Sequence, residues 1–340
     1  MWLHRVMDTS EMNRTRSVSV GQLWHYPVKS MQGEPTDEVS LGPTGVVGDR
    51  AYGFVDVAAG RLVSGKHPKK YAPILECRAA FTEPPRLDAE LPPVRVTFPD
   101  GVTIDGDHDE ITARVGKLLG CEVRMATVAV DADVLVEEVW PHLEGFGPVA
   151  FYRMLQIGTE ADDPAGERMI GFRPAMAAPG TLNDLAAMHV LATSTLATLA
   201  AEHPAGQWDA RRFRPNILFD DGHEVGGNGE DGWVGRDLQI GAGARINIVA
   251  ATPRCIMTTL GQADLPRDPE VLRTMARANR RPLGEFGLFA AAAGAYAEVV
   301  APGTVRVGDR VAVEPSTATG GPLANVMQAM AIALGSEADG

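Results

Sequence analysis

The feature that most constrains the fold of this chain is its frequent glycines and prolines, which separate short apolar runs. The 340 residues include 37 glycines and 24 prolines. Short strands between Gly/Pro turns favour a barrel or sandwich over repeated βαβ units. The sequence therefore predicts a mainly β fold with some α (α+β). In the first half, the runs predicted as strands are 18–23, 51–57, 61–63, 94–98 and 102–104.

The second half continues this strand pattern and adds a few helices. Asp107 and Glu110 form a capping pattern that predicts a helix ending at Gly120. Asp268-Pro269 predicts the start of a second helix, and a short helix-like stretch begins at Thr181. Strands are predicted at 189–192, 216–219, 238–240, 245–249 and 295–300, with a hairpin at 303–313.

We expect two β-rich domains joined by a loop-rich segment. Residues 18–128 are predicted as the first domain and residues 181–314 as the second. Residues 129–180 form the connection or a cover over the two halves, with the aromatic side chains that would shape a substrate site. The tail, residues 315–340, has a periodic apolar stripe that predicts a short helix, docked on the protein or bound to a partner.

Charge and cysteine content exclude several classes of protein. The net charge of −13, from 31 basic and 44 acidic residues, argues against nucleic acid as a partner. No run of about 18 apolar residues predicts a membrane span. Three unpatterned cysteines give no disulfide framework and favour a reducing, cytoplasmic setting. Without a C-x-x-C motif or paired histidines, neither a zinc site nor an iron–sulfur cluster is predicted.

Cys255 is the candidate reactive residue. Arg254 precedes it, and a guanidinium beside a thiol favours the thiolate, which can ligate a metal or attack an electrophile. The alternative is that Cys255 is a small buried apolar residue. A formal G-x-G-x-x-G string at 227–232 contains Glu230 and Asp231 where a phosphate would lie, so we interpret it as a flexible loop.

Four short segments combine rigid backbone residues with cationic or hydroxyl side chains. Prolines fix the chain and glycines permit close approach in these segments, while the polar side chains can donate hydrogen bonds to an anion. If the fold gathers the cations that stand in short loop-like contexts, an acidic protein would have one basic pocket. These cations are Lys29, Arg50, Lys66, Lys69, Lys70, Arg211, Arg212, Arg214 and Arg254. Asp49 and Arg50, within the second segment, are expected to form a structural ion pair. The segments are 26–30 with Lys29-Ser30, 45–50 with Gly48-Asp49-Arg50, 213–216 with Phe213-Arg214-Pro215-Asn216, and 253–255 with Arg254-Cys255.

In this order, and with Thr258-Thr259 and the closing Val307-Gly308-Asp309, the segments resemble the MOSC superfamily preceded by its N-terminal β-barrel domain. The resemblance extends from about residue 18 to residue 313. Within the superfamily the pattern is similar to the mitochondrial amidoxime-reducing component and its bacterial counterparts. The resemblance implies an N-terminal β-barrel-like domain over 18–128 and a C-terminal MOSC β-barrel over 181–314.

The resemblance also implies a molybdenum cofactor (Mo-molybdopterin); pyridoxal phosphate is not expected. Cys255 would be the metal ligand and catalytic residue. Lys66 stands where relatives often have an arginine, so a bidentate contact would be lost there. The residues implied to bind the cofactor are Lys29, Ser30, Lys66, Thr195, Arg214, Asn216 and Arg254.

The implied activity is a molybdenum-dependent oxidoreductase that reduces a small N-oxygenated (N-hydroxylated) substrate by oxygen-atom transfer. Electrons would come from a separate protein, a ferredoxin or a cytochrome b5-like carrier. Two alternatives remain open at this point. One is a sulfur carrier that uses a Cys255 persulfide, and the other is a non-catalytic molybdopterin-binding carrier.

Overall fold

The computed structural model describes most of both β-rich halves. The predicted connection at 129–180, the start of the helix-like stretch at Thr181 and the tail beyond residue 316 lie outside the described residues. No helix in the described part of the chain is long and apolar enough to cross a membrane. The described residues are 17–127, 182–183, 186–222, 229–282 and 289–316.

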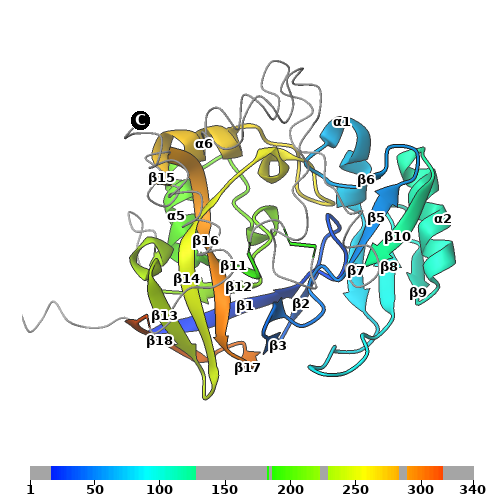
Figure 1. Ribbon diagram of the computed structural model, residues 1–340. Coiled ribbons are helices and arrows are strands. Elements are labelled where there is room, and N and C mark those ends of the chain that lie inside the picture. Colours follow the sequence, from blue (N-terminus) through cyan, green and yellow to red (C-terminus); the bar gives the residue numbers. More distant parts are fainter. Residues whose placement is uncertain (1–16, 128–181, 184–185, 223–228, 283–288, 317–340) are drawn as a thin grey trace, which may run out of the picture.

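A closed barrel of seven strands forms the larger half of the described chain. The strands hydrogen-bond in the order β11-β12-β1-β18-β13-β14-β16, and pairing of β16 with β11 closes the ring. Figure 1 shows this barrel to the left, beside the smaller half. The predicted mainly β fold is confirmed. The barrel strands are β1 (Val18–His25), β11 (Met188–Ala192), β12 (Ile217–Asp220), β13 (Arg236–Ile240), β14 (Ala244–Pro253), β16 (Phe289–Ala301) and β18 (Arg310–Pro315).

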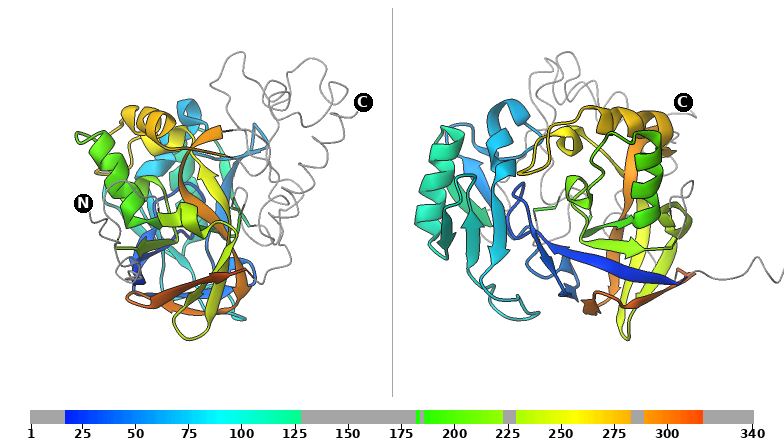
Figure 2. Two further views of the ribbon diagram at one scale, coloured as in Figure 1. Left: turned by 90° about the vertical axis from the view of Figure 1, so that its left-hand side faces the viewer. Right: turned by 180° about the vertical axis from the view of Figure 1, so that it is seen from behind.

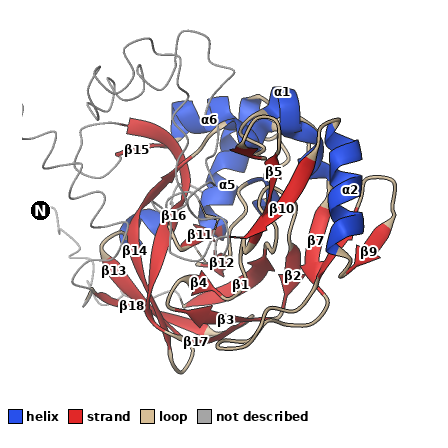
Figure 3. Cartoon of the chain, turned by 45° about the vertical axis from the view of Figure 1, so that its right-hand side comes forward, coloured by secondary structure: helices blue, strands red, loops and turns tan. Residues whose placement is uncertain are grey.

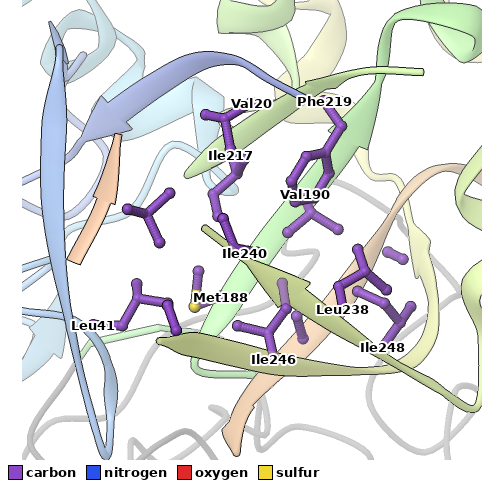
Figure 4. Close-up of a cluster of buried hydrophobic side chains, with 14 of the residues drawn as sticks. Val20, Leu41, Met188, Val190, Ile217, Phe219, Leu238, Ile240, Ile246 and Ile248 are labelled. Atoms are coloured by element: carbon purple, nitrogen blue, oxygen red, sulfur yellow. The ribbon is translucent and has the colours of Figure 1, made fainter. Parts of the chain in front are cut away.

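Alternating apolar residues fill the barrel interior. Val20 of β1, Ile217 of β12 and Ile246 of β14 are almost completely buried and belong to one core cluster (Figure 4). Burial of such a side chain contributes about 1.5–3 kcal/mol relative to exposure. The period of two along β14 shows why the sequence forms a strand there, because every second residue of its first part reaches this core.

The first strand of the chain belongs to this barrel. β1 pairs antiparallel with β12 on one side and with β18 on the other. Residues 18–25, which the sequence assigned to the first domain, pair with strands of the second half and also with residues 34–36 of the first. The short β2 (Glu34–Thr36) pairs with β1, and β15 (Arg280–Pro282) pairs with β16. The chain therefore starts in the barrel, leaves it for the smaller half and returns.

The hairpin predicted at 303–313 is wrong. β17 (Gly303–Arg306) pairs with β3 (Glu38–Gly42), whereas β18 pairs with β13 and β1. The turn between them is held by other strands, because Gly308 N–H donates to the Val20 carbonyl at 2.8 Å and Val307 N–H donates to the Asp37 carbonyl at 3.0 Å. The sequence correctly predicts a turn here, but the strands before and after the turn pair with other strands and not with each other. The remaining strand of that sheet is β4 (Gly45–Val46).

The smaller half consists of two three-stranded sheets and a covering helix around a separate core. The predicted hairpin around Pro99-Asp100-Gly101 is confirmed as β8 and β9. The predicted capping is also confirmed, since Asp107 accepts a hydrogen bond from Glu110 N–H at 2.9 Å and Gly120 ends the helix in the left-handed conformation. The elements are β5 (Tyr52–Asp56), β6 (Arg61–Leu62), β7 (Arg78–Phe81), β8 (Val94–Thr97), β9 (Thr103–Asp105), β10 (Val123–Thr127) and α2 (His108–Leu119).

The other helices lie outside the strand framework (Figure 3). α5 (Thr193–Glu202) was not predicted, and it contacts α6 (Glu270–Ala278). α6 begins one residue later than predicted, with Asp268 accepting a hydrogen bond from Glu270 N–H at 2.9 Å. Figure 2 shows α5 and α6 beside the barrel and α2 on the smaller half. The shorter helices are α1 (Pro68–Tyr71), η2 (Ala72–Glu76), η4 (Ala210–Arg212), η5 (Gly229–Trp233) and η6 (Ile256–Thr259).

Candidate functional site

A pocket of about 130 Å³ is lined by residues of both halves. Seven of the eight residues predicted to form the site line it, and Thr195 does not. The sequence had no local signal for several other lining residues, among them His189 and Thr252. The predicted residues that line the pocket are Lys29, Ser30, Lys66, Arg214, Asn216, Arg254 and Cys255.

The pocket is strongly basic although the chain as a whole is acidic. Within the described chain, no aspartate or glutamate is among the lining residues. A cavity lined by charges of one sign raises the local concentration of ligands of the opposite sign. The arrangement therefore suits an anionic ligand, as expected if the fold gathers the four segments. The cationic lining residues are Lys29, Arg50, Lys66, Arg212, Arg214 and Arg254.

Three non-glycine residues of the pocket have left-handed backbone conformations. The φ angles are 66° for Ser30, 48° for Arg50 and 56° for Arg214. Such a conformation costs about 1–3 kcal/mol for a residue with a side chain and persists where the surrounding structure enforces it. Hydrogen bonds supply part of this constraint: Arg50 N–H donates to the Tyr26 carbonyl at 2.6 Å, and Arg214 N–H to the Ala210 carbonyl at 3.1 Å. Strain concentrated around one pocket is typical of a functional site.

The two arginines with left-handed conformations, Arg50 and Arg214, stack on the buried ring of Tyr26. The guanidinium carbons of Arg50 and Arg214 lie 4.6 Å and 4.5 Å from the ring centroid. Asp49 accepts a hydrogen bond from Tyr26 N–H at 2.9 Å and forms an ion pair with Arg50. The Asp49–Arg50 pair expected from the sequence is therefore present. Besides forming this ion pair, Arg50 also lines the pocket.

Cys255 lies at the turn between the end of β14 and η6, and it is half-buried. Thr258 donates two hydrogen bonds to the Cys255 carbonyl, from its N–H at 3.3 Å and from its hydroxyl at 3.1 Å. The neighbouring Thr259 hydroxyl donates to the Ile256 carbonyl at 2.7 Å. The two threonines that follow the cysteine in the sequence thus shape the turn that presents the thiol to the pocket.

Arg212, which also lines the pocket, stabilises the same turn through hydrogen bonds to backbone carbonyls. Its buried guanidinium donates to the carbonyls of Gln207 at 2.8 Å and Pro266 at 2.7 Å. It also donates at 3.4 Å to the carbonyls of Thr258 and Leu260, which belong to the turn after Cys255. Burial lowers the pKa of Arg212 from its ordinary value. Five donors in a fixed fork make arginine suitable for binding several carbonyls at once.

Arg254 mainly positions the chain next to Cys255. Its guanidinium donates to the carbonyls of Ala293 at 2.7 Å and Phe213 at 3.1 Å, and it contacts the ring of His189. Desolvation lowers the pKa of Arg254 to about 10. Burial and the Arg254 charge hold the pKa of His189 well below its ordinary value, so the imidazole is neutral and can accept from the guanidinium. These contacts join β11, β14 and β16 beneath the pocket.

Asn216 and Thr252, which line the pocket, each have a buried polar atom without a hydrogen-bond partner among the described residues. They are Nδ2 of Asn216 and Oγ1 of Thr252. The other amide atom of Asn216, Oδ1, accepts from His189 N–H at 3.2 Å, which leaves Nδ2 as a donor. A buried polar atom without a partner costs about 1–3 kcal/mol, so each such atom indicates a place for a ligand or an ordered water.

Thr195, which the resemblance implied as a cofactor-binding residue, does not line the pocket. Thr195 is fully buried in the first turn of α5, and its hydroxyl donates to the Glu230 carboxylate at 2.7 Å. The same carboxylate accepts from Ala192 N–H at 3.2 Å and Gly294 N–H at 2.8 Å. The helix turn directs Thr195 toward η5, away from the pocket. Residues 229–232 of the formal glycine motif belong to η5 rather than to a flexible loop, and residues 227–228 lie outside the described residues.

Glu230 gives the fold a pH dependence that can be measured. Burial raises its pKa from 4.5 to about 7, against the lowering effect of the Thr195 and Gly294 hydrogen bonds. The folded state therefore keeps the proton between pH 4.5 and pH 7 while the unfolded state releases it. The contribution of Glu230 to the free energy of unfolding is therefore complete below pH 4.5 and is lost as the pH rises to about 7.

We expect the free energy of unfolding of the wild type, relative to Glu230→Gln, to fall by about 3 kcal/mol over this range. Urea unfolding of both proteins at several pH values measures the difference. The Gln variant cannot titrate at this position and serves as the reference for all other groups. A difference that stays constant, or that increases with pH, would contradict the expected behaviour.

Groups of three or more His, Cys, Asp or Glu residues that could hold a metal ion are absent from the part of the chain that the structure describes. Cys255 is the one thiol among the described residues that line the pocket, and a thiolate is a soft metal ligand.

Comparison with known proteins gives two family matches and several weak structural similarities. No curated protein sequence matches the chain significantly. The YUAD protein from Bacillus subtilis aligns with a TM-score of 0.39 and 10% identity, over 88% of this chain and 97% of that chain. YiiM from Escherichia coli aligns with a TM-score of 0.28 and 16% identity, over 46% of this chain and 66% of that chain. These scores are low and support no argument about function.

The family matches are more informative. The MOSC domain matches residues 179–312, which include the barrel strands from β11 to β16 together with Cys255 and Arg214. The MOSC N-terminal beta barrel domain matches residues 17–79, which include Lys29, Ser30 and Lys66. The pocket therefore takes residues from both matched regions. The chain belongs to the MOSC superfamily, with a MOSC domain preceded by a MOSC N-terminal beta barrel domain.

Proposed function

We propose that the chain binds a molybdenum cofactor in the basic pocket and is an oxidoreductase that reduces small N-oxygenated compounds. MOSC domains are associated with binding of this cofactor. The observation that supports the proposal most strongly is the Cys255 thiol in a pocket lined by six cationic side chains. A soft thiolate suits a redox metal that is already held by sulfur ligands.

The residues present fit the chemistry of the cofactor. Molybdopterin has an anionic phosphate, which Lys29, Lys66 and Arg214 would hold through charge-assisted hydrogen bonds. Nδ2 of Asn216 and Oγ1 of Thr252 offer buried polar atoms for the heteroatoms of the pterin. When bound, the cofactor would supply the redox and oxygen-accepting chemistry.

The protein's own contribution would be to hold the thiol and to stabilise negative charge. Arg212 and the two threonines fix the turn that carries Cys255, so the thiol has one position relative to the pocket. Arg254 braces the adjacent strand end through backbone carbonyls. Cations fixed in a pocket stabilise developing negative charge more than mobile solvent does, because little reorganisation is needed. Lys66 supplies a point charge there, since lysine lacks the planar fork of arginine.

Electrons would come from a separate protein. The three cysteines of the sequence cannot supply the four thiolates of an iron–sulfur cluster. Cys77 is fully buried in the core of the smaller half, and burial raises the pKa of its thiol to about 12. Cys121 and Cys255 lie in different parts of the fold, the first packed against that core and the second in the pocket. A ferredoxin or a cytochrome b5-like protein would be a suitable donor.

The test is the composition and turnover of the purified wild-type chain. Protein made in a molybdenum-replete host is expected to contain stoichiometric molybdenum and pterin, and to oxidise reduced viologen when an N-hydroxylated substrate is added. Absence of both molybdenum and pterin would contradict cofactor binding. Cofactor without turnover would instead identify a non-catalytic carrier. Cyanide-releasable sulfur that depends on Cys255 would identify a sulfur carrier.

A further inference from the structure

A second pocket of about 180 Å³ adjoins the first, because Arg214 lines both. One ordered water needs roughly 10–15 Å³ of such space, so the pocket can hold a molecule considerably larger than water. Tyr26 and Gln262 line this pocket and not the first one. The residues that matter for its chemistry are Tyr26, Gln32, Arg78, Arg211, Arg214 and Gln262.

Tyr26 and Gln262, which line this pocket, each have a buried polar atom without a hydrogen-bond partner among the described residues. They are the Tyr26 hydroxyl and Oε1 of Gln262, and each residue is only 1% exposed. The Gln262 amide is oriented by its own hydrogen bond, since Nε2 donates to the Met257 carbonyl at 3.2 Å. Burial raises the pKa of Tyr26 well above its ordinary value, so its hydroxyl keeps its proton and can donate. The pocket therefore offers one donor and one acceptor.

The charge of the pocket favours an anion. Three arginines line it, and within the described chain no carboxylate does. Arg211 is already held by Asp209 at 2.7 Å and Asp264 at 2.7 Å, so its charge is largely compensated. Arg78 is exposed and forms no ion pair within 4.0 Å among the described residues, and Arg214 lies at the boundary with the first pocket. Arg78 is the cation best placed to meet a ligand that enters from solvent.

We propose that this second pocket binds a small oxyanion that has one hydroxyl group, with inorganic phosphate as the fitting ligand. The Tyr26 hydroxyl donates to one phosphate oxygen, Oε1 of Gln262 accepts from the P–OH group, and Arg78 compensates the charge. Sulfate has the same size and charge but has no proton for Gln262 at neutral pH. The dianion of a phosphate monoester also lacks this proton above its second pKa of about 6.

The proposal predicts selectivity as well as binding. Calorimetric titration of the full chain at pH 7.5 and constant ionic strength is expected to show phosphate binding. Sulfate and methyl phosphate are expected to bind about tenfold more weakly or less, because each leaves Oε1 of Gln262 without a donor. The titration with methyl phosphate tests whether the ligand is free phosphate or a phosphoryl group on a larger molecule.

Variants assign the binding to this pocket. Arg78→Gln, at an exposed position, and Tyr26→Phe, which removes one oxygen, are each expected to weaken phosphate binding about tenfold. Gln262→Met is expected to bring phosphate and sulfate to similar affinity. Arg236→Gln, at an exposed position on β13 outside both pockets, is the matched control and should leave binding unchanged.

Lys66→Met distinguishes the two pockets, because Lys66 lines only the first. Phosphate binding that is lost in Lys66→Met but unaffected in the Arg78, Tyr26 and Gln262 variants would overturn the proposal. Absence of phosphate binding at millimolar concentration would do the same and would mean that the pocket holds only water. Neither result depends on molybdenum content, so the proposed function is tested separately.

Discussion

The Cys255→Ser protein is expected to fold like the wild type and to be purified without molybdenum. A serine hydroxyl is a hard, protonated group at neutral pH and is a poor replacement for a thiolate ligand of a redox metal. The loss of metal affinity should exceed the roughly 10–100-fold loss that follows removal of a group supporting a ligand. Turnover of N-hydroxylated substrates should fall to the level without enzyme.

Cys121→Ser is the matched control, because Cys121 is also half-buried but does not line the pocket. Molybdenum and pterin are measured by elemental analysis and by fluorescence of the oxidised pterin, and the fold of each protein by thermal unfolding. Retention of full molybdenum content and turnover in Cys255→Ser would show that the thiol is not the ligand. Loss of pterin together with molybdenum would show that the metal bond helps to retain the whole cofactor.

Arg212→Met is expected to lower the free energy of unfolding by about 3–5 kcal/mol. Methionine fills similar volume, so the effect isolates the lost hydrogen bonds. The carbonyls of Thr258 and Leu260, which are buried residues, would lose donors at 3.4 Å. The carbonyls of Gln207 and Pro266, which are exposed residues, would lose donors at 2.8 Å and 2.7 Å. Buried polar groups left without a partner cost about 1–3 kcal/mol each. The turn after Cys255 would lose the same anchor, so cofactor content should fall as well.

Arg211, which is adjacent to Arg212, provides the control for this prediction. Arg211 forms ion pairs with Asp209 and Asp264, and the Asp264 side chain is 67% exposed. Exposed ion pairs contribute about 0–1 kcal/mol, so Arg211→Met should lower stability by no more than about 1 kcal/mol. Urea unfolding measures both variants. Equal losses for the two neighbours would show that the backbone contacts of Arg212 do not have the assigned role.

The residues that gather at the first pocket were predictable because their segments have local signatures. Lys29-Ser30, Phe213-Arg214-Pro215-Asn216 and Arg254-Cys255 each combine turn-forming residues with polar side chains, and the structure places all of them around one cavity. The capped helix α2 and the β8–β9 hairpin were predictable for the same reason, since caps and tight turns depend on adjacent residues. Thr195 was misplaced because its direction depends on where α5 begins.

Other features required the tertiary structure. The roles of Arg254 and Arg212 could not be read from their neighbours, because their partners are backbone carbonyls up to 54 positions away. His189 has no distinguishing sequence context, and it reaches the site through the pairing of β11 with β16. The strands predicted as a hairpin at 303–313 pair with strands from the start of the chain. Such long-range pairing leaves no local signal.

The sequence by itself determined the strand-rich fold class, the superfamily and which cysteine lies in the basic pocket, because these depend on short patterns of turns, caps and ordered motifs. The tertiary structure decided which strands close the barrel and how β1 joins strands from the second half of the chain. It also decided which arginines bind backbone carbonyls and which stack on an aromatic ring. Arg212 and Arg254 hold the chain around Cys255, whereas Arg50 and Arg214 stack on Tyr26 at the pocket. The physical reason is that hydrogen bonds and burial act between neighbours in space, which sequence order does not specify.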